Sequence, residues 1–142
     1  MCSNMTIFGT VISGVIVFII GEYIKEIVIK PYSRFRDLRG RIAHDLILYA
    51  NMISNPSTDI IERDNYQKAA NELREVAADL VCLNTTMRCS GKKAIGARKE
   101  AIKSLTRLSD ALITNNNADS LTQNQADVDA IREALKIKRY GA

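Results

Sequence analysis

The chain has 142 residues, with 20 Lys and Arg against 16 Asp and Glu and a formal net charge of +4. This mild charge lacks the dense basic stripe of a dedicated nucleic-acid binder, so RNA is not an expected partner. Three cysteines without CxxC spacing and a single histidine do not provide a zinc set. Since no Gly-rich phosphate loop is present either, the sequence predicts no metal, nucleotide or organic cofactor.

The chain opens with an apolar run, Met5–Gly21, which contains seventeen residues without a charged side chain. A bilayer core of about 30 Å takes about 20 helical residues, with a range of about 17–25, and the run reaches that length if it continues through Ile24. A basic n-region and a small-residue cleavage site, which would indicate a secretory signal, are missing. The sequence therefore predicts a transmembrane anchor with a juxtamembrane extension over residues 1–30. A cleaved signal and a buried core helix are the alternatives.

Basic residues follow this run and none precedes it. They are Lys25, Lys30, Arg34, Arg36, Arg39 and Arg41. Lys and Arg near a span stay on the cytoplasmic side, so the N terminus is expected outside and the C-terminal domain in the cytoplasm. The prediction is a single-pass protein of a bacterial inner membrane with membrane lipid as a partner.

Small and hydroxyl-bearing side chains mark one side of the run. They fall three, four or seven residues apart and so line one helix face: Thr6, Thr10, Ser13, Gly14 and Gly21. Small residues let helix backbones approach closely, and hydroxyls can hydrogen-bond across the contact. This face predicts self-association into a homo-oligomer, and more finely the lining of a pore. The alternative is that such residues are simply common in membrane helices.

The remaining residues, 31–142, have the helical periods of a cytosolic bundle. Pro31 lacks an N–H and would clash with the carbonyl of Ile27, so a kink or a new helix start is expected there. Asp59 and Glu62 have the spacing of a capping box, and Asn115–Gln123 is predicted to be a polar loop. Helices are expected at about Pro31–Ser54, from Asp59 onward, at about Ala94–Ile113 and at about Gln125–Lys138. The predicted fold class is all-α, an N-terminal transmembrane helix followed by an antiparallel bundle of about four helices.

The apolar residues that recur at helical spacing are expected to form the core of this bundle. In chain order they are Phe35, Leu38, Ile42, Leu46, Tyr49, Ile53, Tyr66, Ala69, Ala70, Leu73, Val76, Ala77, Leu80, Val81, Ile95, Ile102, Leu105, Leu108, Leu112, Val128, Ile131, Leu135 and Ile137.

Arg39 and His44 are the one pair with possible chemistry. Histidine titrates near neutral pH and can move a 2′-hydroxyl proton, while arginine can stabilise the charge of a phosphorane. An arginine a few residues before a histidine resembles the signature of HEPN ribonucleases, small helical-bundle proteins that act on RNA. However, residues five apart lie about 140° apart on a straight helix, and Gly40 stands where that family usually has a polar residue. The alternatives are a flanking polar role for His44 and a membrane-anchor patch for the arginines.

The block from Leu38 to Pro56, which ends in Tyr49-Ala50-Asn51 and Ser54-Asn55-Pro56, resembles small bacterial proteins with one N-terminal span and a helical cytosolic remainder. More distantly, the plan is similar to the HEPN-like accessory membrane protein of type VI-B CRISPR systems. That resemblance implies a ring-shaped, pore-forming membrane effector in antiviral defence, with a defence-system protein as a possible partner. Alternatives are a membrane-tethered interaction module and the ribonuclease.

Asn51 and Asn55 lie four residues apart at the expected end of a helix. Together with the small Ala50 they predict a close helix contact that ends at Asn55-Pro56. The functional alternative is that Asn51 faces the axis of an oligomer.

Overall fold

The computed structural model describes residues 3–54, 63–87, 91–114 and 119–137, and within these it describes the side chains of all but residues 3–8 and 119–120. The described chain is helical apart from short ends and turns. Its elements are α1 (Ser3–Ile24), a π-helical turn η1 (Lys25–Ile29), α2 (Lys30–Leu48), α3 (Ala50–Ser54), α4 (Arg63–Thr86), α5 (Lys92–Thr114) and α6 (Asp119–Leu135). The all-α prediction is confirmed for these residues.

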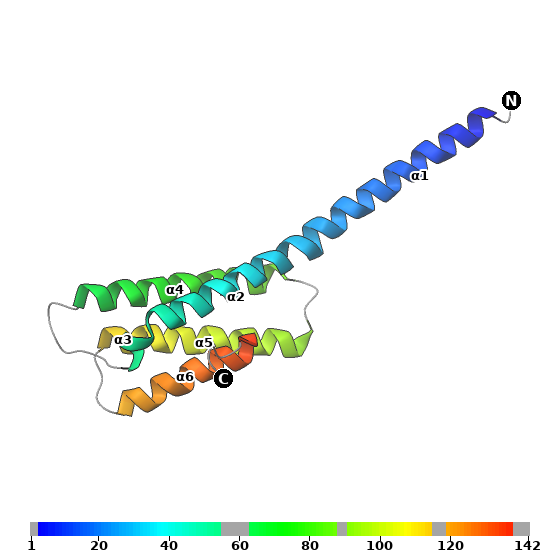
Figure 1. Ribbon diagram of the computed structural model, residues 1–142. Coiled ribbons are helices and arrows are strands. Elements are labelled where there is room, and N and C mark those ends of the chain that lie inside the picture. The colour runs from blue at the N-terminus through cyan, green and yellow to red at the C-terminus, as the bar shows by residue number, and fades with distance from the viewer. Residues whose placement is uncertain (1–2, 55–62, 88–90, 115–118, 138–142) are drawn as a thin grey trace.

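The helices from α2 onward form an antiparallel bundle, and α1 projects away from it (Figure 1). Helix α5 lies in the middle of the bundle and packs against α4 and α6, while α2 packs on α4. The short α3 continues the course of α2 and meets α6. The expectation of a helical bundle with about four main helices is therefore confirmed.

The core follows from the helical period of the apolar residues. Ile42, Leu73, Leu105 and Ile131 are completely buried, one from each long helix of the bundle. The apolar faces of the four helices pack together because this removes apolar surface from water. Each Å² removed stabilises the fold by about 25 cal/mol. Of the predicted core, Val81 is the clear exception: it is 45% exposed, and Leu83 on the same helix is buried instead.

Two helix boundaries differ from the prediction. The helix expected at Pro31–Ser54 is interrupted at Tyr49, whose φ of −95° and ψ of 7° are not helical. The polar loop expected at Asn115–Gln123 is wrong from Asp119 onward, because α6 begins there. Asn124, near the start of α6, connects this helix to α3, since its buried amide Nδ2 donates to the carbonyl of Ile53 at 3.3 Å.

The junction between α1 and the bundle is the π-helical turn η1, which ends at Ile29, two residues before Pro31. In this turn the N–H of Lys30 donates to the carbonyl of Lys25, five residues back. Pro31 has no N–H to offer the carbonyl of Ile27, and its ring crowds that carbonyl. A wider turn relieves this crowding without ending the helix. The predicted kink or new start at Pro31 is thus realised as a π-turn inside one continuous helical column.

The structure corrects the predicted membrane topology. Among the described residues, no helix has both the length and the apolarity that a crossing of the bilayer requires. The expected single-pass inner-membrane location, with the N terminus outside and the C-terminal domain in the cytoplasm, is therefore not retained.

Candidate functional site: the exposed apolar helix

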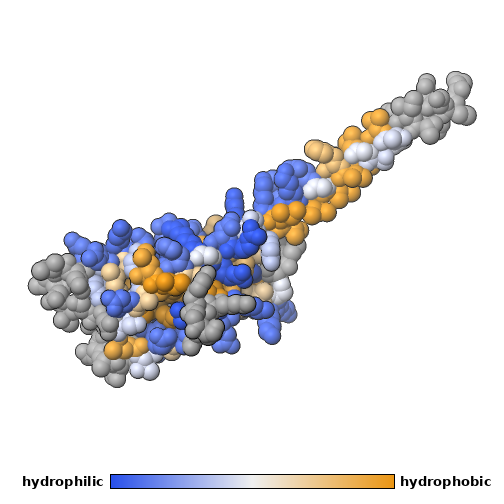
Figure 2. All heavy atoms as spheres, in the orientation of Figure 1, coloured by the Kyte–Doolittle hydropathy of each residue, from blue (hydrophilic) through white to orange (hydrophobic). Residues whose placement is uncertain are grey.

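The most unusual surface of the molecule is the described part of α1, residues 9–24, which we call the α1 rod. Its large apolar side chains from Val11 to Ile20 are 44–71% exposed. Figure 2 shows this part of the projecting helix covered largely by apolar side chains. Monomeric proteins rarely expose a continuous apolar surface of this kind, so the α1 rod is the candidate contact surface of the molecule.

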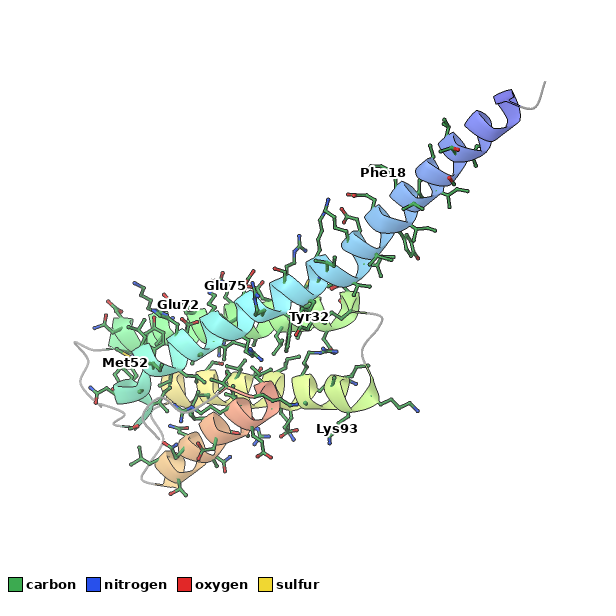
Figure 3. The ribbon with its side chains drawn as sticks, turned by 45° about the vertical axis from the view of Figure 1, so that its right-hand side comes forward. Phe18, Tyr32, Met52, Glu72, Glu75 and Lys93 are labelled. Atoms are coloured by element: carbon green, nitrogen blue, oxygen red, sulfur yellow. The ribbon has the colours of Figure 1, made fainter. Side chains whose placement is uncertain are left out.

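The exposed apolar residues of the α1 rod are not confined to one face. Val15, Ile16, Val17, Phe18, Ile19 and Ile20 are six consecutive residues, and each of them is at least half exposed. Six residues cover more than one helical turn of about 3.6 residues. Phe18, labelled in Figure 3, lies on the part of α1 that projects beyond the bundle. A partner that covers only one side of α1 would leave the other sides in water.

The residues of the predicted small-residue face lie on α1, and the role of this face in self-association stays a prediction. A side chain added at Gly14 or Gly21 would meet no atom within 4 Å, so a neighbouring backbone could approach both positions. The hydroxyl of Ser13 donates to the carbonyl of Thr10 at 2.9 Å, within the same helix. The side chain of Thr6 lies outside the described residues.

Charged residues adjoin the α1 rod, and they are paired within the chain. Lys25 lies 3.1 Å from Glu22, and Lys30 contacts Glu26. The hydrogen bond from Lys30 holds the pKa of Glu26 below its ordinary value. Each of these pairs neutralises itself, so this segment adds no net charge where α1 leaves the bundle.

Arg39 and His44 are both placed on α2, but no hydrogen bond or ion pair joins them among the described residues. Arg39 lines a cleft that α2 shares with α5 and α6. The side chain of His44 is 71% exposed, and its Nδ1 lies 3.1 Å from Oδ1 of the buried Asp45. Asp45 thus orients the imidazole, and the ribonuclease interpretation stays a prediction.

The other basic residues near the α1 rod differ in their contacts. Arg41 contacts Glu75 at 3.2 Å and Asp79 at 3.6 Å, which ties α2 to α4. The hydrogen bond to Glu75 raises the pKa of Arg41 above its ordinary value. Both carboxylates lie on α4, where Figure 3 labels Glu75. Arg41 therefore has a partner inside the bundle, which the sequence did not indicate.

Of the two asparagines in the predicted contact, only Asn51 belongs to the described part of the chain. Asn51 lies in α3 and its side chain is exposed. Asn55 and Pro56 lie outside the described residues, as does the capping box at Asp59 and Glu62. The stop predicted at Asn55-Pro56 and the axis-facing role of Asn51 therefore stay predictions.

The sequence did not lead us to Arg98 and Asn124, two polar residues that are buried in the bundle. Arg98 is 4% exposed and Asn124 is 3% exposed. Both stand at core-facing positions of their helices. Arg98 is three residues after Ile95, and Asn124 is four residues before Val128. The helical spacing of these two residues therefore indicated core-facing positions, but the predicted core contained apolar residues only.

No family of proteins, no curated protein and no solved structure matches the chain. The resemblances noted from the sequence block Leu38–Pro56 therefore stay predictions.

Proposed function

We propose that this protein is a self-assembling module in which the α1 rods of several copies pack together and their bundles surround the shared contact. The observation that supports this proposal is the exposure of large apolar side chains on every face of the α1 rod. Apolar surface gains about 25 cal/mol for each Å² removed from water. One rod cannot bury itself, because it projects from its own bundle (Figure 1).

Further copies of the same chain suit this surface better than a single unlike partner. The α1 rod carries no charge before Glu22, so another rod is complementary to it without any charged match. Gly14 and Gly21 are seven residues apart and therefore share a face, where two backbones can approach closely. The neighbouring charges are paired within each chain, so they do not drive the copies apart.

The proposal is tested by the mass of the assembly for the wild-type chain and for Gly14→Ile with Gly21→Ile. Isoleucine at these positions fills the space that a neighbouring backbone would occupy. We expect the wild-type chain to form an oligomer of more than two copies, and the double variant to dissociate at least about tenfold more readily, which corresponds to about 1.4 kcal/mol. Native mass spectrometry from a mild detergent and sedimentation in buffer give the two values.

Gly9→Ile is the matched control. Gly9 is also a glycine of the α1 rod with no atom within 4 Å of an added side chain, but it lies about 120–140° away from Gly14 and Gly21 around the helix. It should leave the assembly unchanged. A monomeric wild-type chain would contradict self-assembly, and a monomer that floats with lipid vesicles would identify lipid as the partner of the α1 rod.

The finer prediction of a pore-like effector in antiviral defence stays a prediction. It rests on the resemblance alone, and it requires a bilayer crossing that the described residues do not provide. A membrane-tethered interaction module depends on the same anchor. Self-assembly needs neither, because it depends only on the exposed surface of α1.

A further inference from the structure

Arg98 on α5 is a buried cation that has no anionic partner in the described part of the chain. Its Nε donates to Oδ1 of Asn84 at 2.8 Å, and its Nη1 lies 3.6 Å from the sulfur of Met87. The guanidinium lies 5.7 Å from the centre of the Phe35 ring. The buried Nη2 has no hydrogen-bond acceptor among the described residues.

The partners of Arg98 are all neutral: an amide, a thioether and an aromatic ring. A buried charge is strongly unfavourable unless an opposite charge or enough hydrogen bonds compensate it. Burial accordingly lowers the pKa of Arg98. No carboxylate of the described residues forms an ion pair with it, so only neutral contacts balance its positive charge inside the bundle.

Arg98 lines a cleft between α2, the beginning of α5 and the end of α6. The cleft has a volume of about 830 Å³, within the range of about 300–1,000 Å³ that small-molecule sites occupy. Three more cations line it: Arg39, Lys93 and Lys136. Figure 3 labels Lys93 near the start of α5. The cleft therefore has a positive wall.

Two features of α5 strengthen this potential. The helix begins beside the cleft, and its first turn contains no acidic residue. The first N–H groups of a helix have no partner within the helix and carry partial positive charge, which favours anions. Two carboxylates, Glu100 and Glu133, also line the cleft, but both are exposed, and Glu100 lies 3.9 Å from Arg107.

The rest of the cleft is lined by apolar residues, and most of their side chains are small. These residues are Phe35, Ala94, Ala97, Ala130, Ala134 and Leu135. Alanine side chains leave room that longer residues would fill. The cleft is therefore suited to a ligand that has an apolar body as well as a negative group.

We propose that this cleft binds an amphiphilic oxyanion, a carboxylate or phosphate on a small apolar body, with Arg98 as the residue that receives the anion. The oxyanion accepts hydrogen bonds from the guanidinium, and Lys93 and Lys136 lie at the exposed edge. The apolar body packs against the alanines and Phe35. The lining residues lie outside the α1 rod, so this proposal does not rest on the proposed self-assembly.

The test uses the full chain with three probes: decanoate below its micelle concentration, decanol, and inorganic phosphate. Calorimetric titration and the thermal midpoint are measured for each. We expect decanoate to bind and to raise the midpoint by several degrees, phosphate to bind at least tenfold more weakly, and decanol to leave the midpoint unchanged. Equal binding of phosphate would overturn the apolar part of the proposal, and equal binding of decanol would overturn the anionic part.

Arg98→Met keeps the length of the side chain and removes its charge. We expect this variant to lose at least tenfold in decanoate affinity while the unliganded midpoint rises or stays constant, because the uncompensated charge is gone. A merely structural Arg98 would instead lower the unliganded midpoint. Unchanged decanoate binding by Arg98→Met would overturn the proposal.

Two further variants make the test independent of Arg98. Ala130→Leu fills the cleft and leaves all its cations in place, and it should weaken decanoate binding at least tenfold. Lys99→Met removes an exposed charge next to Arg98 that does not line the cleft, and it should bind as the wild type does. All these variants keep the α1 rod, so adsorption of decanoate there would be equal in each, and equal binding by all of them would overturn the proposal.

Discussion

At the scale of single residues, Tyr49 joins the two halves of an interrupted helix. Its backbone leaves the helical region between α2 and α3, but its N–H donates to the carbonyl of Asp45 at 2.9 Å and its carbonyl accepts from Ile53 at 2.9 Å. Its hydroxyl donates to the carboxylate of Glu72 on α4. The buried side chain of Tyr49 thus fixes the interruption between α2 and α3 to α4.

The phenol of Tyr49 should make stability depend on pH in the alkaline range. Burial, and after it the hydrogen bond to Glu72, raises the pKa of Tyr49 from 10.0 to about 12. Between these values the unfolded chain loses the phenolic proton first, so the free energy of unfolding should fall as pH rises from about 10 to about 12. Denaturant unfolding at several pH values, with tyrosinate absorbance, measures both effects.

Tyr49→Phe is the control for this titration. It keeps the ring in the core and removes the ionisable group. The absorbance step near pH 12 and the associated loss of stability should both be absent. If the variant keeps the same pH dependence, another group is responsible.

At the scale of elements, the link between α6 and α3 depends on a buried amide. Asn124 donates to the carbonyl of Ile53, and both residues are buried. Asn124→Ala should lower the free energy of unfolding by about 1–3 kcal/mol, because it leaves a buried carbonyl without this donor. Chemical denaturation measures the loss. Gln125→Ala, an exposed neighbour on the same helix, should change stability by no more than about 0.5 kcal/mol.

The course of the helices was predictable from the sequence where burial follows the apolar period. Ile42, Leu73 and Leu105 recur with helical spacing and are completely buried. The break at Tyr49 and the start of α6 at Asp119 were not predictable, because both depend on partners on other helices. Arg98 was missed for a different reason: its spacing from Ile95 indicated a core-facing position, but the predicted core contained apolar residues only.

At the scale of the whole molecule, the α1 rod and the bundle are separable in energetic terms. Every buried apolar residue of the described core lies at Leu38 or later. A chain of residues 25–142 should therefore keep the unfolding free energy within about 0.5 kcal/mol of that of the full chain. It should also be monomeric. Thermal unfolding and light scattering measure the two properties, and a large loss of stability would show that α1 contributes to the fold.

The junction at η1 connects the α1 rod, which we propose for self-assembly, with the bundle that contains the Arg98 cleft. The helical column runs from α1 through the π-turn into α2 without a loop, and α2 carries Phe35 and Arg39 on one wall of the cleft. A continuous helix is stiff, so the orientation of one end restricts the orientation of the other. Because no loop separates α1 from α2, contacts that fix the orientation of α1 in an assembly would also constrain α2, and with it Phe35 and Arg39.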